Sequence, residues 1–400
     1  MASLVETRLK PTLTMAEVFG ANHVYAPRAH PRTCDWVIRD PALLDAITAN
    51  QLAVVGEMPV VCSAGAATPN GLELLAEAGL EVPVSTHTYR DPQNAIETAA
   101  HFAKAGTKVI VQHIYPRGVL DDGALWIDAR LLSYLNNKAN LAELVPSANL
   151  ASRRVVNSET LFSSASSPSF PVVLKVATDL STGSGVDVEI CRTIDDFEAA
   201  RMRFSGCERL VVESCQSILR NVCLNYAVMP DGTTRYLGFA DQDSDANGRY
   251  RGNWISLGST LPAEVIGIGL AIVTRGAALG YRGFAGIDIV KIDDARWMVL
   301  DLNFRVNGST AAVLLAPAVQ RSLGPCWLHL RSFACETGFT HLIAVTRPAL
   351  RSGSLIPLGT FDPLVAGHPG QPSRLFALIV ADSQAAAHRA EAELAASGLV

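Results

Sequence analysis

The alternation of apolar and polar residues divides the first third of the chain into short strands and amphipathic helices. Residues 70–80, "NGLELLAEAGL", carry apolar side chains at helical spacing, and Gly79 closes the predicted helix. Residues 91–106, "DPQNAIETAAHFAKAG", open with Asp91 as a predicted N-cap and also end in a glycine. The β-branched run at 107–115, "TKVIVQHIY", predicts a strand. This strand and helix order favours an α/β layer.

The pattern changes after residue 125. A helical stretch, "WIDARLLSYLNNKANLAELVP", ends at Pro146, and a serine-rich segment that we expect to be a surface loop follows at 163–169. The region 170–257 is mostly strand-like, with one helix in "DDFEAARMRFSG". A long helix is predicted over 262–280, and the tail after residue 341 contains the strand "RLFALIVA" and an Ala/Glu-rich helix.

These changes predict a mixed α/β (α+β) protein built from three units. The first is an α/β domain over residues 1–135. The second, over 136–340, holds most of the strands, and the third is a small C-terminal α+β segment over 341–400. The tail could cap a cleft or form a dimer contact, so a homodimer is left open.

Composition narrows the range of functions. The chain has 400 residues and a net charge of -5, which argues against nucleic acid as the main partner. No apolar run reaches the length of a membrane span, and the first residues do not resemble a signal peptide. The eight cysteines form no C-x-x-C pair, so we expect reduced thiols in a cytoplasmic protein.

Candidate chemistry is concentrated in one predicted hairpin, "GFAGIDIVKIDDARWMVLDLNFRVNGS" at 283–309. Side chains alternate along a strand, so Asp301, Asn303 and Arg305 share one face. Asp288 joins them if it pairs opposite residue 299 or 301. Two carboxylates on an apolar sheet repel each other unless a cation lies between them, and hard oxygen ligands suit Mg²⁺. The alternative is a solvated polar face on an edge hairpin.

Three other segments carry groups that suit a nucleotide. Lys175 ends the apolar strand in "FPVVLKV", and Lys138 is a second candidate for phosphate. A flexible loop that could approach phosphate oxygens follows Lys175, namely Ser181, Thr182, Gly183, Ser184 and Gly185. Glu213 ends the strand "RLVVES", where a carboxylate can accept from adenine or ribose. An ordinary hairpin turn and an ordinary strand-end glutamate are the alternatives.

In order along the chain, these segments resemble the ATP-grasp superfamily. The similar pieces are "LNNKANLAELVP", "VVLKVATDLSTGSGV", "LVVES", "GFADQDSDANGRYRGN", "GFAGIDIV" and "VLDLNFRVNGS", within residues 131–312. The sequence of these pieces is most similar to that of the peptide-ligase branch that includes the pheganomycin-type ligases. The resemblance implies an ATP-grasp fold, with residues 1–135 as the domain that precedes it.

The resemblance also implies roles for individual residues. Lys138 and Lys175 would hold the phosphates, the 181–185 loop would cover them, and Glu213 would meet the adenine. The metal ligands for Mg²⁺ would be Asp288, Asp301 and Asn303. Arg305 would face the transferred phosphoryl group. Asn307 and Ser309 lie next to it and would contact the acyl acceptor. Arg251 is a candidate for a substrate carboxylate, with a solvated arginine as the alternative.

Two positions depart from the family pattern. The family commonly has glutamate where this chain has Asp301, which is one methylene shorter. The family often has a second acid, for the ribose, about seven residues after the adenine glutamate. Here the chain has Arg220 and Asn221, so Asn221 is the candidate for that contact.

The implied activity is an ADP-forming ligase. Its cofactors would be ATP and Mg²⁺, and it would join a small carboxylic acid to an amine, such as an amino acid or peptide, through an acyl phosphate. We expect an amide or peptide bond made in specialised biosynthesis. Transfer of the acyl group to a carrier-protein thiol or an intramolecular amine is one alternative. An inactive ATP-binding regulatory protein is another.

Overall fold

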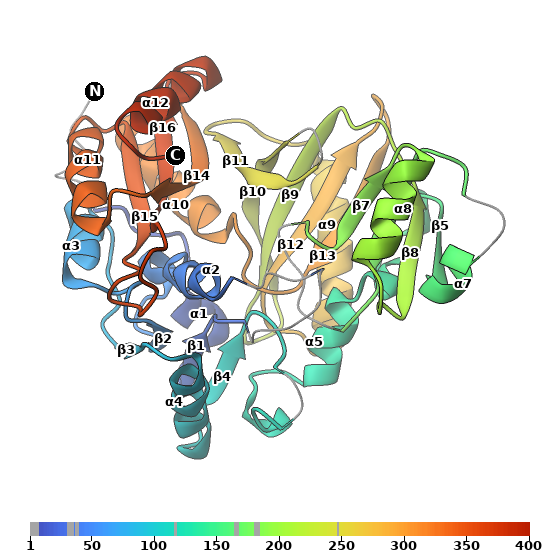
Figure 1. Cartoon of the computed structure of the whole chain (residues 1–400), viewed down its shortest axis with the longest axis horizontal. Coiled ribbons are helices and arrows are strands. Elements are labelled where there is room, and N and C mark those ends of the chain that lie inside the picture. Colours follow the sequence, from blue (N-terminus) through green and yellow to red (C-terminus); the bar gives the residue numbers. More distant parts are fainter. Residues whose placement is uncertain are drawn as a thin grey trace.

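The computed structural model describes residues 8–29, 36, 40–115, 118–163, 168–179, 185–245 and 248–400, arranged around three β-sheets. Figure 1 shows the sheets side by side, with the smallest all-antiparallel sheet at the right and the N-terminal layer at the lower left. None of the helices in these ranges combines the length and apolar character that a membrane crossing needs.

The N-terminal layer is a four-stranded parallel sheet with strand order β3-β2-β1-β4. Its strands are β1 (His23–Ala26), β2 (Val60–Ser63), β3 (Thr86–Tyr89) and β4 (Lys108–Val111), and its helices are α1 (Met15–Phe19), α2 (Pro41–Ala46), α3 (Pro69–Glu77) and α4 (Pro92–Lys104). The predicted N-cap of α4 is confirmed, because Asp91 Oδ1 accepts from the Gln93 backbone N–H at 2.7 Å.

A second four-stranded sheet is antiparallel and has the order β5-β8-β6-β7. It contains β5 (Arg153–Asn157), β6 (Val172–Val176), β7 (Val188–Cys191) and β8 (Arg209–Ser214), with helices α7 (Ser158–Ser163) and α8 (Ile194–Arg203). Leu174, Phe197 and Leu210 belong to its separate apolar core. This sheet, which we call the small sheet, carries Lys175 and Glu213 on adjacent strands.

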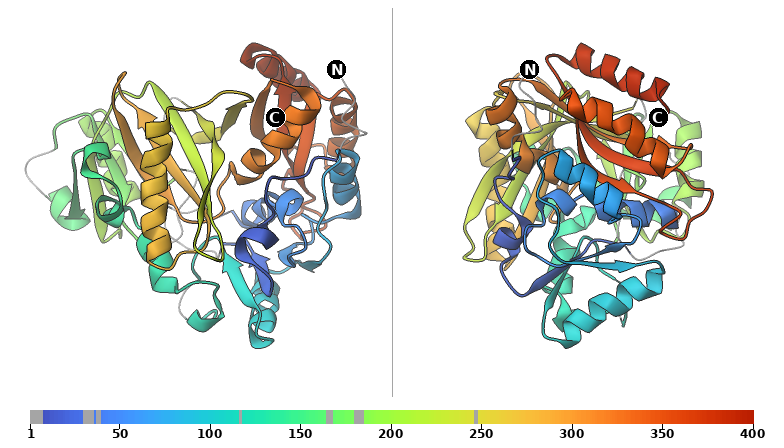
Figure 2. Two further views of the ribbon diagram at one scale, coloured as in Figure 1. Left: turned by 180° about the vertical axis from the view of Figure 1, so that it is seen from behind. Right: turned by 90° about the vertical axis from the view of Figure 1, so that its left-hand side faces the viewer.

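The largest sheet has eight strands in the order β13-β12-β9-β10-β11-β14-β16-β15. They are β9 (Arg220–Val228), β10 (Thr234–Ser244), β11 (Tyr250–Ser256), β12 (Gly283–Lys291), β13 (Trp297–Asn303), β14 (Trp327–Cys335), β15 (Leu355–Phe361) and β16 (Ser373–Ala381). Helix α9 (Ala263–Ala278) packs against β9 and β10, as the view from behind in Figure 2 shows. The large sheet places the hairpin β12–β13 at its edge.

The last three strands continue this sheet into the C-terminal part of the chain. Helices α11 (Phe339–Arg351) and α12 (Gln384–Ala396) pack against them, and α3 of the N-terminal layer packs against β15. Helix α10 (Thr310–Leu323) packs against β10. Strands from both sides of residue 340 therefore belong to one sheet. The predicted boundaries at 135 and 340 stay predictions.

One predicted helix is interrupted. The stretch that ends at Pro146 forms α5 (Ala129–Asn136), a single 3₁₀ turn and α6 (Leu141–Leu144). The break occurs at Asn137, whose backbone is extended and whose side-chain Oδ1 accepts from the Ala139 N–H at 3.0 Å. This interruption turns Lys138 inward, and its side chain is buried. Helices α10 and α11 were not predicted.

Candidate active site

The hairpin β12–β13 brings the predicted metal ligands together. Asp288 lies opposite Asp301 in the strand register, and a β-bulge follows in which Leu300 is the extra residue. Asn303 Nδ2 donates to Asp288 Oδ2 at 3.1 Å. Gln242 Nε2, from β10, donates to Asp288 Oδ1 at 2.8 Å. Both oxygens of the Asp288 carboxylate are therefore oriented by amide donors.

The electrostatics of the pair Asp288 and Asp301 favour a bound cation. Burial, and secondarily the charge of Asp301, raise the pKa of Asp288 to about 6. A divalent cation between the two carboxylates would remove that repulsion. Carboxylate and amide oxygens are also the ligand types that Mg²⁺ takes in proteins. Asp288, Asp301 and Asn303 therefore suit Mg²⁺.

Lys138 lies between two carboxylates. Its Nζ is 2.8 Å from Asp187 Oδ2 and 3.1 Å from Asp301 Oδ2. Burial alone would lower the pKa of Lys138, but the charges of Asp187 and Asp301 raise it above its ordinary value. The lysine is thus charged, and it is fixed beside a predicted metal ligand.

Lys175 and Glu213 form a second buried pair on the small sheet. Lys175 Nζ lies 2.6 Å from Glu213 Oε2 and donates to the carbonyl of Leu300 at 2.9 Å. Arg153 Nη1 lies 3.3 Å from Glu213 Oε1. Because Leu300 is the bulge residue beside Asp301, Lys175 ties the small sheet to the metal hairpin. A cleft lined by Arg153, Glu213 and their strand neighbours lies at this edge.

Arg305 follows β13 and is held by Asn136. The side-chain Oδ1 of Asn136 accepts from Arg305 Nη1 and from the Phe304 N–H, each at 3.0 Å. A cleft at this position is lined by residues of the N-terminal layer, α5 and the hairpin, including Gln112, His113, Asn136, Lys138, Asp301 and Arg305. Thr178 and Asp179, which follow β6, also line it, so four distant segments meet around the cleft.

Asn307 and Ser309 are arranged by an amide network. Asn307 Nδ2 donates to Asn225 Oδ1 at 3.1 Å, and Asn307 Oδ1 accepts from the Ser309 N–H at 2.9 Å. Asn225 Nδ2 donates to Ser309 Oγ at 3.1 Å. Gly286 on β12 leaves room for this packing, since a Cβ there would lie 2.3 Å from Asn307 Nδ2.

Of the remaining predicted residues, Asn221 contacts this group indirectly, Arg251 is exposed, and most of the predicted loop lies outside the described residues. Asn221 Nδ2 donates to Gln242 Oε1 at 3.1 Å, so Asn221 supports the glutamine that orients Asp288. Arg251 is exposed on β11, and its carbonyl accepts from Arg331 at 2.9 Å. Within the predicted loop, Gly185 is described and has a φ of 72°. The rest of that loop, Ser181 to Ser184, lies outside the described residues.

Sequence reasoning missed the residues that support this site. Their shared property is that they hold a predicted residue in place: Asn136, Arg153, Asp187, Gln242 and Asn225. Three of them stood in segments that drew attention for other residues, Asn136 in "LNNKANL", Asp187 in "STGSGVDVEI" and Gln242 in "GFADQDS". A search for amides next to each candidate charge would have found Asn136, which is two positions before Lys138.

Comparison with known families shows the family of this chain. A family model described as "L-aspartate--L-methionine ligase, ATP grasp" matches residues 151–303. A second, "L-aspartate--L-methionine ligase N-terminal domain", matches residues 14–133, and together the two span more than half of the chain. The chain belongs to the ATP-grasp ligases. The predicted family, fold class and ligase class of this ATP-grasp ligase are confirmed. ATP and Mg²⁺, predicted as its cofactors, are those of the family.

Solved structures share the fold of this ATP-grasp ligase. An N5-carboxyaminoimidazole ribonucleotide synthetase in complex with ADP has a TM-score of 0.59 at 17% identity, covering 87% of this chain and 93% of its own. The Staphylococcus aureus N5-carboxyaminoimidazole synthetase with ADP has a TM-score of 0.57 at 10% identity, with coverages of 98% and 99%. An L-amino acid ligase from Bacillus licheniformis has a TM-score of 0.52 at 13% identity, with coverages of 94% and 98%. At these identities the likeness concerns the fold.

Proposed function

We propose that this ATP-grasp ligase joins the carboxyl group of one L-amino acid to the amine of another and releases ADP and phosphate. The observation that carries the proposal is the grouping of Lys138, Asp301 and Arg305 around one cleft, with Asp288 paired opposite Asp301. The description of the matching family makes L-aspartate and L-methionine the first pair to test. The proposed setting is the cytoplasm, where ATP and reduced thiols occur together.

The chemistry explains why such a cleft is needed. A carboxylate is a poor electrophile because its leaving group would be oxide, and transfer of a phosphoryl group from ATP supplies a better one. Both reactants are anions, so the protein must offset their repulsion. A magnesium ion, when bound by the hairpin, would neutralise charge on the phosphate oxygens.

The protein's own residues divide the remaining work. Lys138 and Lys175 are both buried and contact adjacent residues of the hairpin, Asp301 and Leu300, which suits two contacts along a polyphosphate. Arg305 presents a planar guanidinium that can bind two phosphoryl oxygens, and Asn136 fixes its direction. In this proposal Glu213 accepts from the adenine amino group at the edge of the small sheet, beside Lys175.

The acceptor side is proposed to lie near Asn307 and Ser309. Their side chains are held by Asn225, so their positions are defined before an amine arrives. Attack of the amine on the acyl phosphate forms the amide and expels phosphate. Water must be kept away during this step, because it would hydrolyse the acyl phosphate. Arg251 remains a candidate contact for a substrate carboxylate at the edge of β11.

The test is release of ADP by the full chain with Mg²⁺, ATP and pairs of L-amino acids, beginning with L-aspartate and L-methionine. The proposal expects ADP release that requires both amino acids, together with a dipeptide detected by mass. Omission of either amino acid is the control for simple ATP hydrolysis. ADP release that requires a carrier-protein thiol would show that the acceptor is a thiol and not an amine. Nucleotide binding without turnover on a broad panel of amino acids would favour a regulatory role.

A further inference from the structure

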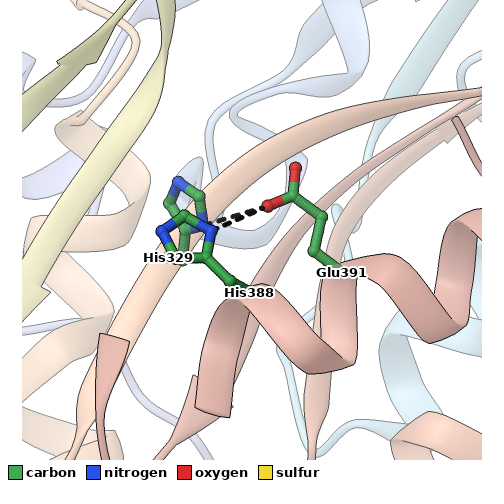
Figure 3. A group of neighbouring side chains, drawn as sticks. All are labelled: His329, His388 and Glu391. Atoms are coloured by element: carbon green, nitrogen blue, oxygen red, sulfur yellow. Dashed lines mark ion pairs between the residues drawn. The ribbon is translucent and has the colours of Figure 1, made fainter. Parts of the chain in front are cut away.

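A second group of metal-ligating side chains lies away from the magnesium hairpin. His388 and Glu391 are three residues apart on α12, so both side chains project from one face of the helix. They meet His329, which lies on β14 of the large sheet. Figure 3 shows both imidazole rings directed toward one oxygen of the Glu391 carboxylate. The ligand atoms of the three residues all lie within 4.8 Å of one another.

His329 has the surroundings of a metal ligand. Its side chain is fully buried, at 0% exposure, and its ring stacks on Trp254 with centroids 3.6 Å apart. Nε2 lies 3.2 Å from Asp243 Oδ2, so a proton on Nε2 would be donated to that carboxylate. This arrangement leaves Nδ1 with its lone pair free and aimed at Glu391. In the described part of the chain, Nδ1 has no hydrogen-bond partner.

The protonation state agrees with this geometry. Burial lowers the pKa of His329 to about 4, and the charge of Glu391 offsets only part of that effect. The ring is therefore neutral at pH 7, which is the form that binds metals. A carboxylate on the far nitrogen is the usual outer partner of a ligating histidine, since it fixes the tautomer and the ring orientation.

The distances are close to those of a metal centre. Glu391 Oε2 lies 3.5 Å from His388 Nδ1 and 3.8 Å from His329 Nδ1. A tetrahedral ion with bonds of about 2.0–2.1 Å would place its ligand atoms about 3.3 Å apart. All three ligand atoms lie within 4.8 Å of one another, and His388, which is 61% exposed, has room to move toward the other two.

The charges around Glu391 and the orientation of its carboxylate also suit a bound metal ion. Arg331 Nη2 lies 2.6 Å from Glu391 Oε1, so it holds one oxygen and leaves Oε2 toward the histidines. The guanidinium is a cation close to the group, but Asp243 and Glu391 together supply two negative charges against its one. The net charge of these three groups beside the two imidazoles is therefore negative, which favours a divalent cation.

We propose that His329, His388 and Glu391 bind one divalent ion of the zinc class and thereby fasten α12 to the large sheet. Two nitrogen ligands and one carboxylate select zinc, cobalt or nickel over magnesium and calcium, which prefer oxygen. Because His388 is exposed, water can complete the coordination. The site shares no ligand with Asp288, Asp301 and Asn303, and it does not depend on the proposed ligation.

The test is titration of the full chain with Zn²⁺ by calorimetry, and with Co²⁺ by absorption, in excess Mg²⁺ to occupy the oxygen-ligand site. The expected result is one equivalent of Zn²⁺ and visible Co²⁺ bands typical of a nitrogen-ligated ion. His388→Ala changes an exposed residue, so the fold should survive, and it should weaken Zn²⁺ binding at least about 10-fold. His101→Ala, which removes an exposed histidine on α4, should bind as the wild type does.

A second variant separates this site from unrelated surface binding. Glu391→Gln keeps the size of the side chain and removes its charge, so it should also weaken Zn²⁺ binding at least about 10-fold. Zn²⁺ should raise the melting temperature of the wild type but not that of His388→Ala, because the ion would tie α12 to β14 only when all three ligands are present. Equal Zn²⁺ affinity in wild type and His388→Ala, or an absence of binding in the wild type, would overturn the proposal.

Discussion

Lys138 Nζ lies 3.1 Å from Asp301 Oδ2, so a lysine predicted to bind phosphate forms an ion pair with an aspartate predicted to bind metal. The same ammonium lies 2.8 Å from Asp187 Oδ2. This relationship joins two parts of the candidate site that are far apart in sequence. Any change in the lysine therefore alters the charge around the metal hairpin as well as the contact to a nucleotide.

The first prediction concerns stability. Lys138→Met should destabilise the fold by about 3–5 kcal/mol, because it leaves Asp187 and Asp301 without the cation between them. Lys175→Met should cost less, since Glu213 keeps Arg153 at 3.3 Å. Urea unfolding of the two variants beside the wild type gives the comparison. A Lys138 variant as stable as the wild type would show that the ion pairs contribute nothing to folding.

The sequence predicted the charged residues of the site better than it predicted the residues that hold them in place. The alternation in "VLDLNFR" was enough to place Asp301, Asn303 and Arg305 on one face, and Asp288 does pair opposite Asp301. Asp187 was not recognised, because its partner Lys138 lies 49 positions away in a different segment. Pairings of that kind arise from tertiary packing, and local periodicity carries no information about them.

The same distinction holds for the fold. Helix α4 was predicted from its N-cap and its final glycine, which are local signals. Helix α10 escaped notice because its first seven residues, 310–316, are all buried, so this half lacks the polar face that gives a helical period. The break at Asn137 was also hidden, since an asparagine that caps a turn reads as an ordinary helix residue when neighbouring positions keep their spacing.

The second prediction tests the metal hairpin. Asp301→Asn should reduce turnover by about 10²-fold or more, because it removes a carboxylate from the proposed magnesium ligands while keeping the side-chain shape. Asp294→Asn is the matched control, as it changes a fully exposed aspartate in the turn of the same hairpin. Rates of ADP release over a range of Mg²⁺ concentrations would compare the two. Wild-type rates in Asp301→Asn would remove Asp301 from the metal site.

The third prediction compares two glycines of α9. A Cβ on Gly276 would lie 2.5 Å from the ring of Phe304, which is buried next to Arg305. Gly276→Ala should therefore destabilise the fold by about 1–3 kcal/mol and lower activity by displacing that segment. Gly267→Ala meets nothing within 4 Å and should stabilise by about 0.4–1 kcal/mol. Thermal unfolding of both variants checks the opposite signs, and two changes of the same sign would contradict the packing argument.

The fourth prediction uses thiol reactivity to report on the proposed adenine site. Of the seven cysteines in the described ranges, all free, only Cys215 is not buried, and it lies two residues after Glu213. A thiol reagent should label Cys215 first. Burial raises the pKa of Cys62 to about 12, so that thiol should stay unreactive in the folded protein. Peptide mapping of a Cys34→Ser variant avoids the one cysteine outside the described residues.

A bound nucleotide should change the rate at which the thiol reagent labels Cys215. If adenine lies beside Glu213, ADP with Mg²⁺ should slow labelling of Cys215 several-fold, because the base would cover the end of β8. Guanosine diphosphate is the control, since it lacks the amino group that Glu213 is proposed to accept from. Protection by both nucleotides alike would indicate a phosphate effect alone. Labelling of Cys215 that ADP leaves unchanged at saturating concentration would place the base elsewhere in the cleft.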